Sequence, residues 1–178
     1  SAMLVSKDRS DSLMLRLMTS PMTASDFVLG YTLPLLPIAT IQILIVFIAS
    51  IPLGLRLTTS VLISVTTLIP AAVLFIGIGL LFGTILSEKQ VGGICGALMT
   101  NLCAWLSGIW FDVSAVGKWF ETIAKALPFI HAVDAARAAA SGDYSAVMPD
   151  LIWVIIYAVV VSVAAIWLFS HKIKSKNI

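Results

Sequence analysis

Charged residues are absent from four long stretches of the chain, and these stretches dominate its pattern. They occupy positions 27–55, 57–87, 90–111 and 151–171, and hold 29, 31, 22 and 21 residues. A helix needs about 20 apolar residues to cross a hydrocarbon core roughly 30 Å thick. The pattern therefore predicts an all-α membrane protein with four transmembrane helices.

Proline and glycine refine the expected bounds of these helices. Pro34 and Pro37 fall early in the first stretch, and Pro52 and Gly54 mark its far end. Because proline interrupts the backbone hydrogen bonds of a helix, we expect the first span at 35–53. The other spans are expected at about 60–86, 91–110 and 151–170.

The connection 112–150 is long for a loop without structure of its own. Val116, Phe120 and Ile123 recur at helical spacing, and Pro128 separates this segment from a second one at about 129–140. Ser141-Gly142 is a suitable end for the second segment. The pattern predicts two short amphipathic helices that lie in the outer membrane interface or re-enter it. An ordinary folded outer loop is the alternative.

Residues 1–30 form a charged lead-in to the first span. Residues 11–20 are typical of a short helix that Pro21 interrupts, and Thr23 stands three positions before Asp26, as in a capping box. This arrangement suits a docking element for a soluble partner. A solvated lead-in with no partner is an equally good interpretation of the spacing alone.

Composition supports the membrane assignment and excludes several classes. The chain is 60% hydrophobic and only 11% charged, against about 25% charged for soluble domains, and its mean hydropathy is +1.05. Two cysteines, Cys95 and Cys103, cannot make a disulfide framework. The net charge of +2 comes without the clustered Lys and Arg of a nucleic-acid-binding protein.

The distribution of Lys and Arg predicts the orientation. With both termini in the cytoplasm, seven Lys and Arg residues lie inside and four outside, as the positive-inside rule requires. The inside residues are Lys7, Arg9, Arg16, Lys89, Lys172, Lys174 and Lys176, and the outside ones are Arg56, Lys118, Lys125 and Arg137.

Catalytic and metal-binding signals are missing from the sequence. Gly117-Lys118 lacks the upstream glycine of a phosphate-binding loop. His131 and His171 are expected on opposite sides of the membrane, so they do not form a metal pair. We therefore expect neither an enzyme nor a metal site. The spacing of Gly79 with Gly83, and of Gly92 with Gly96, predicts two faces for close helix packing.

Three segments, taken in order, resemble the membrane subunit of ABC transporters, specifically the type-2 permease (exporter) family. Residues 16–30 resemble the family's cytoplasmic loop, in which a charged stretch leads to a Ser-Pro break before a span. Residues 106–111, Leu-Ser-Gly-Ile-Trp-Phe, are similar to the end of its penultimate span. Residues 128–137 are similar to its proline, aromatic, Ala-Val-Asp/Glu-Ala-x-x-Arg signature.

The resemblance implies six helices per subunit, a second permease copy and a cytoplasmic ATPase that binds ATP and Mg²⁺, with no cofactor in this chain. The family's first two spans have no counterpart, so the chain resembles the C-terminal four-span portion. The implied coupling element, which would contact the ATPase, comprises Ser20, Pro21, Met22, Thr23, Ser25 and Asp26. The implied outer gate or re-entrant region includes Ser107, Gly108, Phe111, Pro128, Asp134 and Arg137.

The expected function is that of a permease subunit in the bacterial plasma membrane. It would export an amphipathic substrate, such as a drug or lipid, and would be powered by the separate ATPase. The alternative is a small four-helix structural or assembly protein of the lipid bilayer that transports nothing and packs through its glycine faces.

Overall fold

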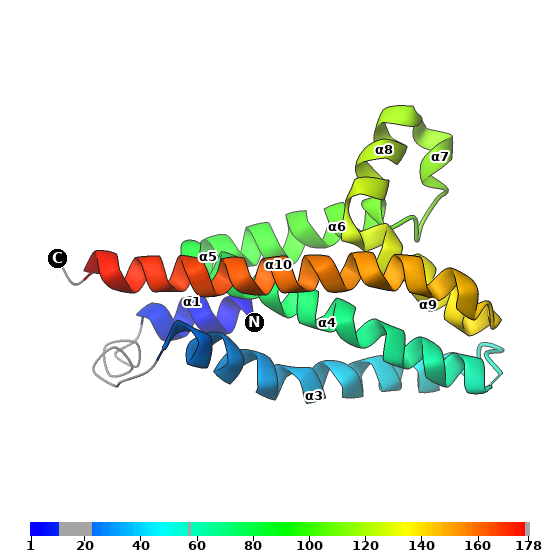
Figure 1. Cartoon of the computed structure of the whole chain (residues 1–178), viewed down its shortest axis with the longest axis horizontal. Helices are drawn as coiled ribbons and strands as arrows, with labels where there is room; N and C mark the ends of the chain where they lie inside the picture. The colour runs from blue at the N-terminus through cyan, green and yellow to red at the C-terminus, as the bar shows by residue number, and fades with distance from the viewer. Residues whose placement is uncertain (11–22, 57, 177–178) are drawn as a thin grey trace.

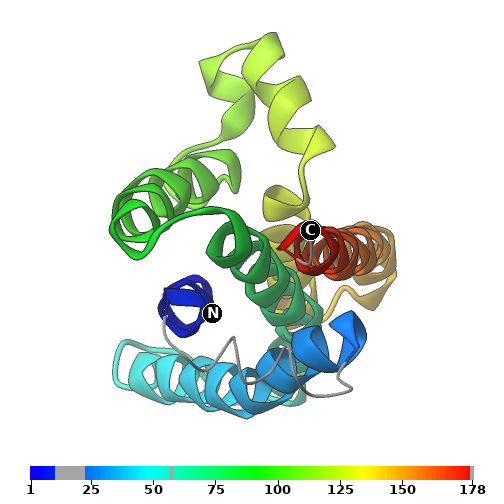
Figure 2. The ribbon, with the colours of Figure 1, turned by 90° about the vertical axis from the view of Figure 1, so that its left-hand side faces the viewer.

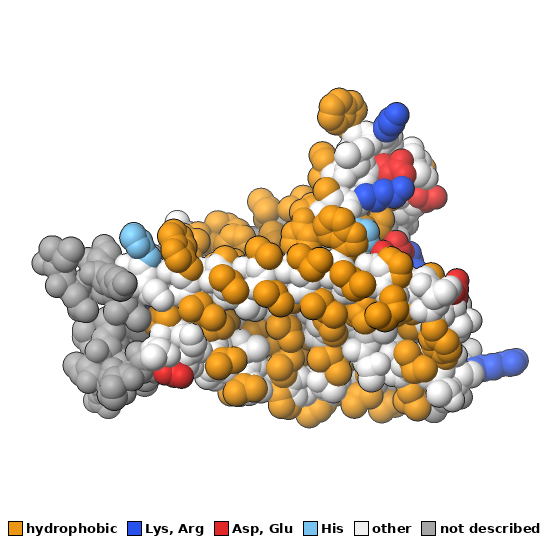
Figure 3. Space-filling model, in the orientation of Figure 1, with side chains coloured by type: hydrophobic (Ala, Val, Ile, Leu, Met, Phe, Trp, Pro, Cys, Tyr) orange, Lys and Arg blue, Asp and Glu red, His pale blue; other side chains and the backbone are white. Residues whose placement is uncertain are grey.

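The computed structural model describes residues 1–10, 23–56 and 58–176, and all regular structure in these residues is helical (Figure 1). Three helices are long and apolar enough to cross a membrane: α3 (Ala24–Ser50), α4 (Thr59–Ile85) and α10 (Tyr144–Lys176), the last over Tyr144–His171. The all-α fold predicted from the charge-free stretches is confirmed. Figure 3 shows apolar side chains along the flank of the bundle and charged ones toward its ends and on the projecting α7–α8 region.

The fourth predicted span corresponds to three consecutive short elements. They are α5 (Glu88–Val91), η1 (Gly92–Met99), which is a π-helix, and α6 (Thr100–Leu106). No one of them is long enough to count as a spanning helix, so the fourth span stays a prediction. The run differs from the expected 91–110 by ending at Leu106, where Ser107 and Gly108 begin a turn.

Helix α3 begins earlier than expected, at Ala24, and passes through both Pro34 and Pro37. Its start is fixed by the predicted capping box, in which Thr23 accepts from the Asp26 backbone and Asp26 accepts from the Thr23 backbone. Prolines are tolerated inside apolar spanning helices, so the expectation that the prolines would delay the helix was wrong. Helix α4 agrees with the expected 60–86 to within one residue at each end.

Helix α4 lies at the centre of the bundle, and α10 packs along one side of it (Figure 2). One buried cluster joins them to α3 and to α1 (Ala2–Ser10), with the rings of Phe27 and Phe169 stacked at a centroid distance of 3.6 Å. A second cluster joins α4 and α10 to α9 (Pro128–Ser141) around Leu74 and Val154. At Gly77 helices α4 and α10 approach so closely that an added Cβ would lie 3.0 Å from Val161.

Polar side chains of α1 join this helix to the ends of its neighbours. The Arg9 guanidinium donates to the carbonyl oxygens of Thr84 and Leu86, the latter at 2.9 Å. A cation at a helix C-terminus satisfies carbonyls that have no partner within the helix and complements the helix dipole. The Tyr31 hydroxyl donates to Asp8 at 2.6 Å. Helix α1 is thereby tied to α3 and α4.

The connection 112–150 folds into helices, as the spacing predicted. Helix α7 (Val113–Val116) and α8 (Lys118–Ala126) form a hairpin that projects from the bundle (Figure 1). Helix α9 then packs against α4 and α10 in the bundle. Pro128 begins α9, and Gly142 ends it in the left-handed conformation with φ 86°. The interfacial or re-entrant position of these helices stays a prediction.

Candidate functional site: an apolar groove and a polar vestibule

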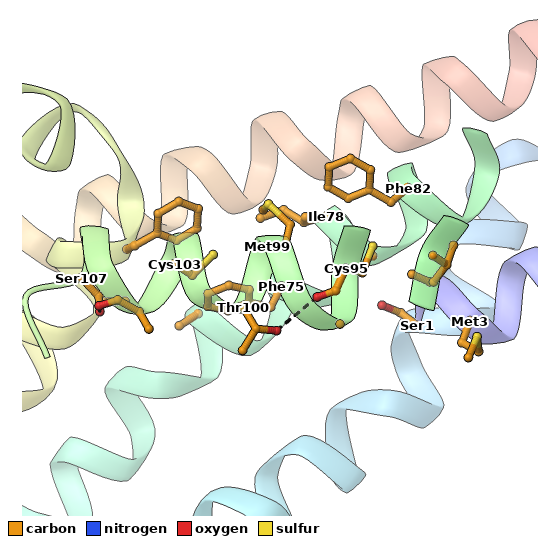
Figure 4. Close-up of a pocket in the computed structure, with 18 of the residues that line it drawn as sticks. Ser1, Met3, Phe75, Ile78, Phe82, Cys95, Met99, Thr100, Cys103 and Ser107 are labelled. Atoms are coloured by element: carbon orange, nitrogen blue, oxygen red, sulfur yellow. Dashed lines mark hydrogen bonds between the residues drawn. The ribbon is translucent and has the colours of Figure 1, made fainter. Parts of the chain in front are cut away.

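An apolar groove runs between α4 on one side and η1 and α6 on the other (Figure 4). Its cavity volume is about 690 Å³, within the range of roughly 300–1,000 Å³ that is usual for small-molecule sites. Phe75, Ile78 and Phe82 line it from α4, and Phe129 and Val133 of α9 close one end. The wall opposite α4 includes Cys95, Met99, Thr100, Cys103 and Ser107.

The π-helix η1 forms the wall of this groove. π-Helical segments are rare and frequently occur at functional sites. Thr100, which lines the groove, donates to the Cys95 carbonyl at 3.1 Å, and its neighbour Asn101 donates to the Ala97 carbonyl at 2.7 Å. The wall therefore presents sulfur, methyl groups and glycines to the groove, and its polar atoms are satisfied locally.

The two glycine pairs predicted as packing faces have different surroundings. At Gly83 an added Cβ would lie 2.6 Å from the Ala2 carbonyl oxygen, because α1 packs directly on this face of α4. Gly79 is covered by Ser1 and by the Ala2 backbone, and it also lies at the edge of the groove. At Gly92 and Gly96 an added Cβ would meet nothing within 4 Å. Among the described residues, no helix packs against the second pair, which instead lines the groove.

A second cavity, here called the polar vestibule, opens beneath the α7–α8 hairpin. Its volume is also about 690 Å³, and it shares Ser107 and Ile109 with the apolar groove, so the two are adjacent. The vestibule is lined by residues 107–114 together with Glu121, Lys125, Ile130, Asp134 and Arg137.

The charges of the vestibule are arranged in pairs. Lys125 Nζ lies 2.6 Å from Glu121 Oε1, and Arg137 Nη1 lies 3.7 Å from Asp134 Oδ1. Arg137 also donates to the carbonyl oxygen of Gly108 at 3.2 Å. Asp112 caps α7 by accepting from Ser114. With three carboxylates and two cations on its wall (2 − 3 = −1), the vestibule has a net negative charge.

Environment shifts the pKa of several of these groups. Hydrogen bonds from Ser114 lower the pKa of Asp112, and the Glu121 carboxylate raises the pKa of Lys125. Burial, followed by repulsion from Asp150, raises the pKa of Asp134. The surroundings thus favour the charged forms of Asp112 and Lys125, and they make ionisation of Asp134 less favourable than that of an exposed aspartate.

His131 makes contacts between helices that the sequence did not indicate. Its Nδ1 lies 2.6 Å from Asp150 Oδ1, its Nε2 lies 2.9 Å from the Lys125 carbonyl oxygen, and its ring stacks on Trp153. These contacts join α8, α9 and α10. No sequence spacing could have suggested them, because Asp150 is 19 residues away on another helix. Among the described residues, no group of three His, Cys, Asp or Glu side chains could hold a metal ion.

Five of the six residues predicted for the outer gate line the vestibule: Ser107, Gly108, Phe111, Asp134 and Arg137. The sixth, Pro128, is buried at the start of α9, where it begins the helix. The sequence did not foresee that Ser107 would join this vestibule to an apolar groove. Of the predicted coupling element, Thr23, Ser25 and Asp26 lie at the start of α3, and Ser20, Pro21 and Met22 lie outside the described residues, as does the predicted helix 11–20.

The long apolar helices define the chain as an integral membrane protein. Residues 1–140 match the family described as ABC-2 type transporter. This match covers more than half of the 178 residues, so the chain belongs to the ABC-2 type transporter family and is a non-catalytic membrane component, the permease part of an ABC transporter. No curated protein and no solved structure matches the chain.

Proposed function

We propose that the chain is the permease subunit of an exporter that moves an amphipathic substrate, powered by a separate ATPase. The observation that carries this proposal is the family match over residues 1–140, joined to an apolar groove that meets a polar vestibule. An amphipathic molecule needs both environments, and the two cavities share Ser107 and Ile109. The structural-protein alternative requires neither cavity.

The proposal includes four membrane crossings. Helix α4 ends near α1 and α5, and α7 lies at the opposite end of the bundle (Figure 1). Residues 88–106 therefore connect the two ends, which supports a fourth crossing made of α5, η1 and α6. In this topology α1, the start of α3 and the C-terminal part of α10 lie on the cytoplasmic side, as the positive-inside rule predicts.

The start of α3 is the proposed receiver of the ATPase motion. Its capping box, with Thr23 Oγ1 at 2.7 Å from Asp26 Oδ2, gives the helix a rigid first turn. Closure of an ATPase dimer on residues 20–26 of two permease copies would shift the helices between inward-facing and outward-facing states. Such a shift requires that the ATP-bound ATPase binds one state more tightly than the other.

Co-purification of the ATPase tests the proposal. The tagged chain should retain an ABC ATPase from its own cells, and Thr23→Ala together with Asp26→Asn should reduce the retained ATPase severalfold. Thr58→Ala is the matched control, because Thr58 is the N-cap of α4, has no capping bond, and precedes a helix that starts at the opposite end. If the unsubstituted protein retains no ATPase, or if the double variant and Thr58→Ala retain equal amounts of it, the structural alternative is favoured.

A further inference from the structure

Both ring nitrogens of His131 face groups that accept hydrogen bonds. Nδ1 lies 2.6 Å from Asp150 Oδ1 on α10, and Nε2 lies 2.9 Å from the Lys125 carbonyl oxygen in the last turn of α8. A carbonyl oxygen and an ionised carboxylate only accept, so each nitrogen must carry a hydrogen to satisfy its contact. A neutral imidazole carries one such hydrogen and an imidazolium carries two. The geometry therefore fits the imidazolium.

A neutral ring keeps only one of these two bonds. Hydrogen bonds to an ionised carboxylate are the stronger ones, so the remaining hydrogen stays on Nδ1, and the lone pair of Nε2 then faces the Lys125 carbonyl oxygen. The His131 and Asp150 side chains are only 14% and 25% exposed, so water replaces the lost bond only in part. Loss of one proton from the ring therefore releases α8, whereas α9 stays bound to α10.

The surroundings of the ring complement a positive charge. The ring stacks on Trp153 with a centroid distance of 5.4 Å and an interplanar angle of 7°, and aromatic faces attract cations. The charged side chains that interact with this site, directly or through a paired neighbour, are Asp150 on α10, Glu121 and Lys125 on α8, and Asp134 and Arg137 on α9. They comprise three carboxylates and two cations, so an imidazolium brings the group to neutrality.

We propose that His131 is a proton-dependent clasp that holds the C-terminal end of α8 against α10. The imidazolium joins the Lys125 carbonyl to the Asp150 carboxylate, and loss of one proton opens the clasp on the side of α8. Because α8 supplies Glu121 and Lys125 to the vestibule, opening of the clasp loosens one wall of that cavity. Histidine ordinarily changes charge between pH 5 and 8, so this wall is tighter in mild acid. The clasp belongs to the folded chain alone and requires no ATPase.

Tyr157 provides a second bond between α10 and the same end of α8. Its hydroxyl donates to the Ala126 carbonyl at 2.6 Å, next to the carbonyl that His131 holds, and this bond does not involve the imidazole. The second bond limits how far α8 moves when the clasp opens, so the expected change is a local loosening of its last turn. It also supplies a structural control, because Tyr157→Phe removes a bond to this helix end without removing the titrating ring.

Two measurements on the purified chain in nanodiscs test the clasp. Nitrogen NMR of ring-labelled histidine counts the protonated nitrogens of His131, and the chain has only one other histidine, His171. Hydrogen exchange of the amides of residues 122–127 reports the order of the last turn of α8, as protection factors in which the intrinsic pH dependence of exchange is divided out. From pH 5 to 8 the ring should pass from two protonated nitrogens to one, and protection should fall about fivefold over the same interval.

Three variants separate the clasp from an ordinary structural contact. Asp150→Asn should keep protection high without a pH step, because its amide donates to Nδ1 of a neutral ring whose Nε2 hydrogen still reaches the Lys125 carbonyl. His131→Phe retains a stacking ring without N–H groups, so protection should be low at every pH. His171→Phe is the matched control and should keep the step, because this ring also stacks on a tryptophan, Trp167, and has no hydrogen bond within the described residues.

Several results would overturn the proposal. A ring that keeps the same number of hydrogens from pH 5 to 8, or that titrates without a change in protection, would remove the proton dependence. A step that persists in Asp150→Asn and disappears in Asp134→Asn would assign it to Asp134. If His131→Phe does not fold, Tyr157→Phe decides, because it should lower protection at every pH and keep the step. An intact clasp without ATPase retention would refute the transport function and leave the clasp standing.

Discussion

Two glycine pairs with the same spacing differ in whether another segment packs against them. Gly79 and Gly83 lie under α1, and a Cβ at Gly83 would be 2.6 Å from a backbone oxygen and 2.9 Å from the Cβ of Val5. Gly92 and Gly96 face an open groove of about 690 Å³. A small-xxx-small pattern allows close approach, but it does not determine whether a helix occupies the space.

The difference follows from what else holds each region. Helix α1 is bound to α4 by the Arg9 guanidinium at carbonyls near the end of α4 and to α3 by Asp8 at Tyr31, so its backbone is kept against Gly83. No described element is bonded to η1 in this way. One pair has therefore become a packing surface and the other has become the wall of a cavity.

The largest expected effect comes from Gly83→Ala. The new methyl group would meet backbone atoms of Ala2, which cannot move aside as a flexible side chain could. Overpacking of this kind costs about 1–3 kcal/mol, so the free energy of unfolding should fall and α1 should exchange amide hydrogens faster. Thermal unfolding in detergent and hydrogen exchange would measure both. An unchanged melting temperature would show that α1 does not pack here.

Arg9→Ala should produce the next largest effect by weakening the attachment of α1. The variant would leave the Thr84 and Leu86 carbonyls without this donor. Because Arg9 is only half-buried, water can replace part of the interaction, and the loss should be about 1 kcal/mol. Denaturant unfolding would measure the loss. Arg56→Ala, which removes an exposed arginine at the far end of α4, should change stability little. Equal losses in the two variants would contradict the role of Arg9.

Gly96→Ala is the counterpart of Gly83→Ala and should have the opposite sign. The added Cβ meets no atom within 4 Å, and alanine in a helix costs less conformational entropy than glycine by roughly 0.5–1 kcal/mol. The melting temperature should stay the same or rise slightly. A fall comparable to that of Gly83→Ala would mean that another segment packs against η1, and would remove the contrast between the two pairs.

The smallest expected effect is a pH dependence at the vestibule, where the groove ends. The pKa of Asp134 is raised, so its contribution to stability is present below the ordinary Asp pKa and is lost as pH rises through the folded value. The pKa of Asp112 is lowered, so its contribution is present above the ordinary pKa and is lost as pH falls through the folded value. Differences in melting temperature between the unsubstituted protein and Asp134→Asn or Asp112→Asn, measured from pH 3 to 7, should therefore slope in opposite directions. Parallel slopes would contradict the assignment of Asp134 as the disfavoured carboxylate.

Local signals in the sequence predicted much of the fold. The charge-free stretches predicted the three spanning helices. The Thr23–Asp26 spacing predicted the start of α3, and Gly142 predicted the end of α9. Each depends on residues close together in the chain. The prolines misled the prediction for α3, because their effect on a helix depends on its apolar surroundings as well as on the backbone.

The candidate site could be predicted only in part. The resemblance of residues 106–111 and 128–137 to a known family brought together five residues that do line the vestibule. The apolar groove, the π-helical wall and the contacts of His131 were not predicted. Each arises from residues that are far apart in sequence, or from a register of backbone hydrogen bonds that composition does not specify.

The sequence by itself determined that this protein lies in a membrane, because 11% charged residues cannot cover a water-soluble surface and the apolar stretches match the thickness of a bilayer. It also determined where most helices start and stop, since caps and turns are local. Only the tertiary structure decided which glycine pair would be covered by a helix and which would line a cavity. The physical reason is that packing depends on bonds such as those of Arg9 to the end of α4, which join residues about 75 positions apart.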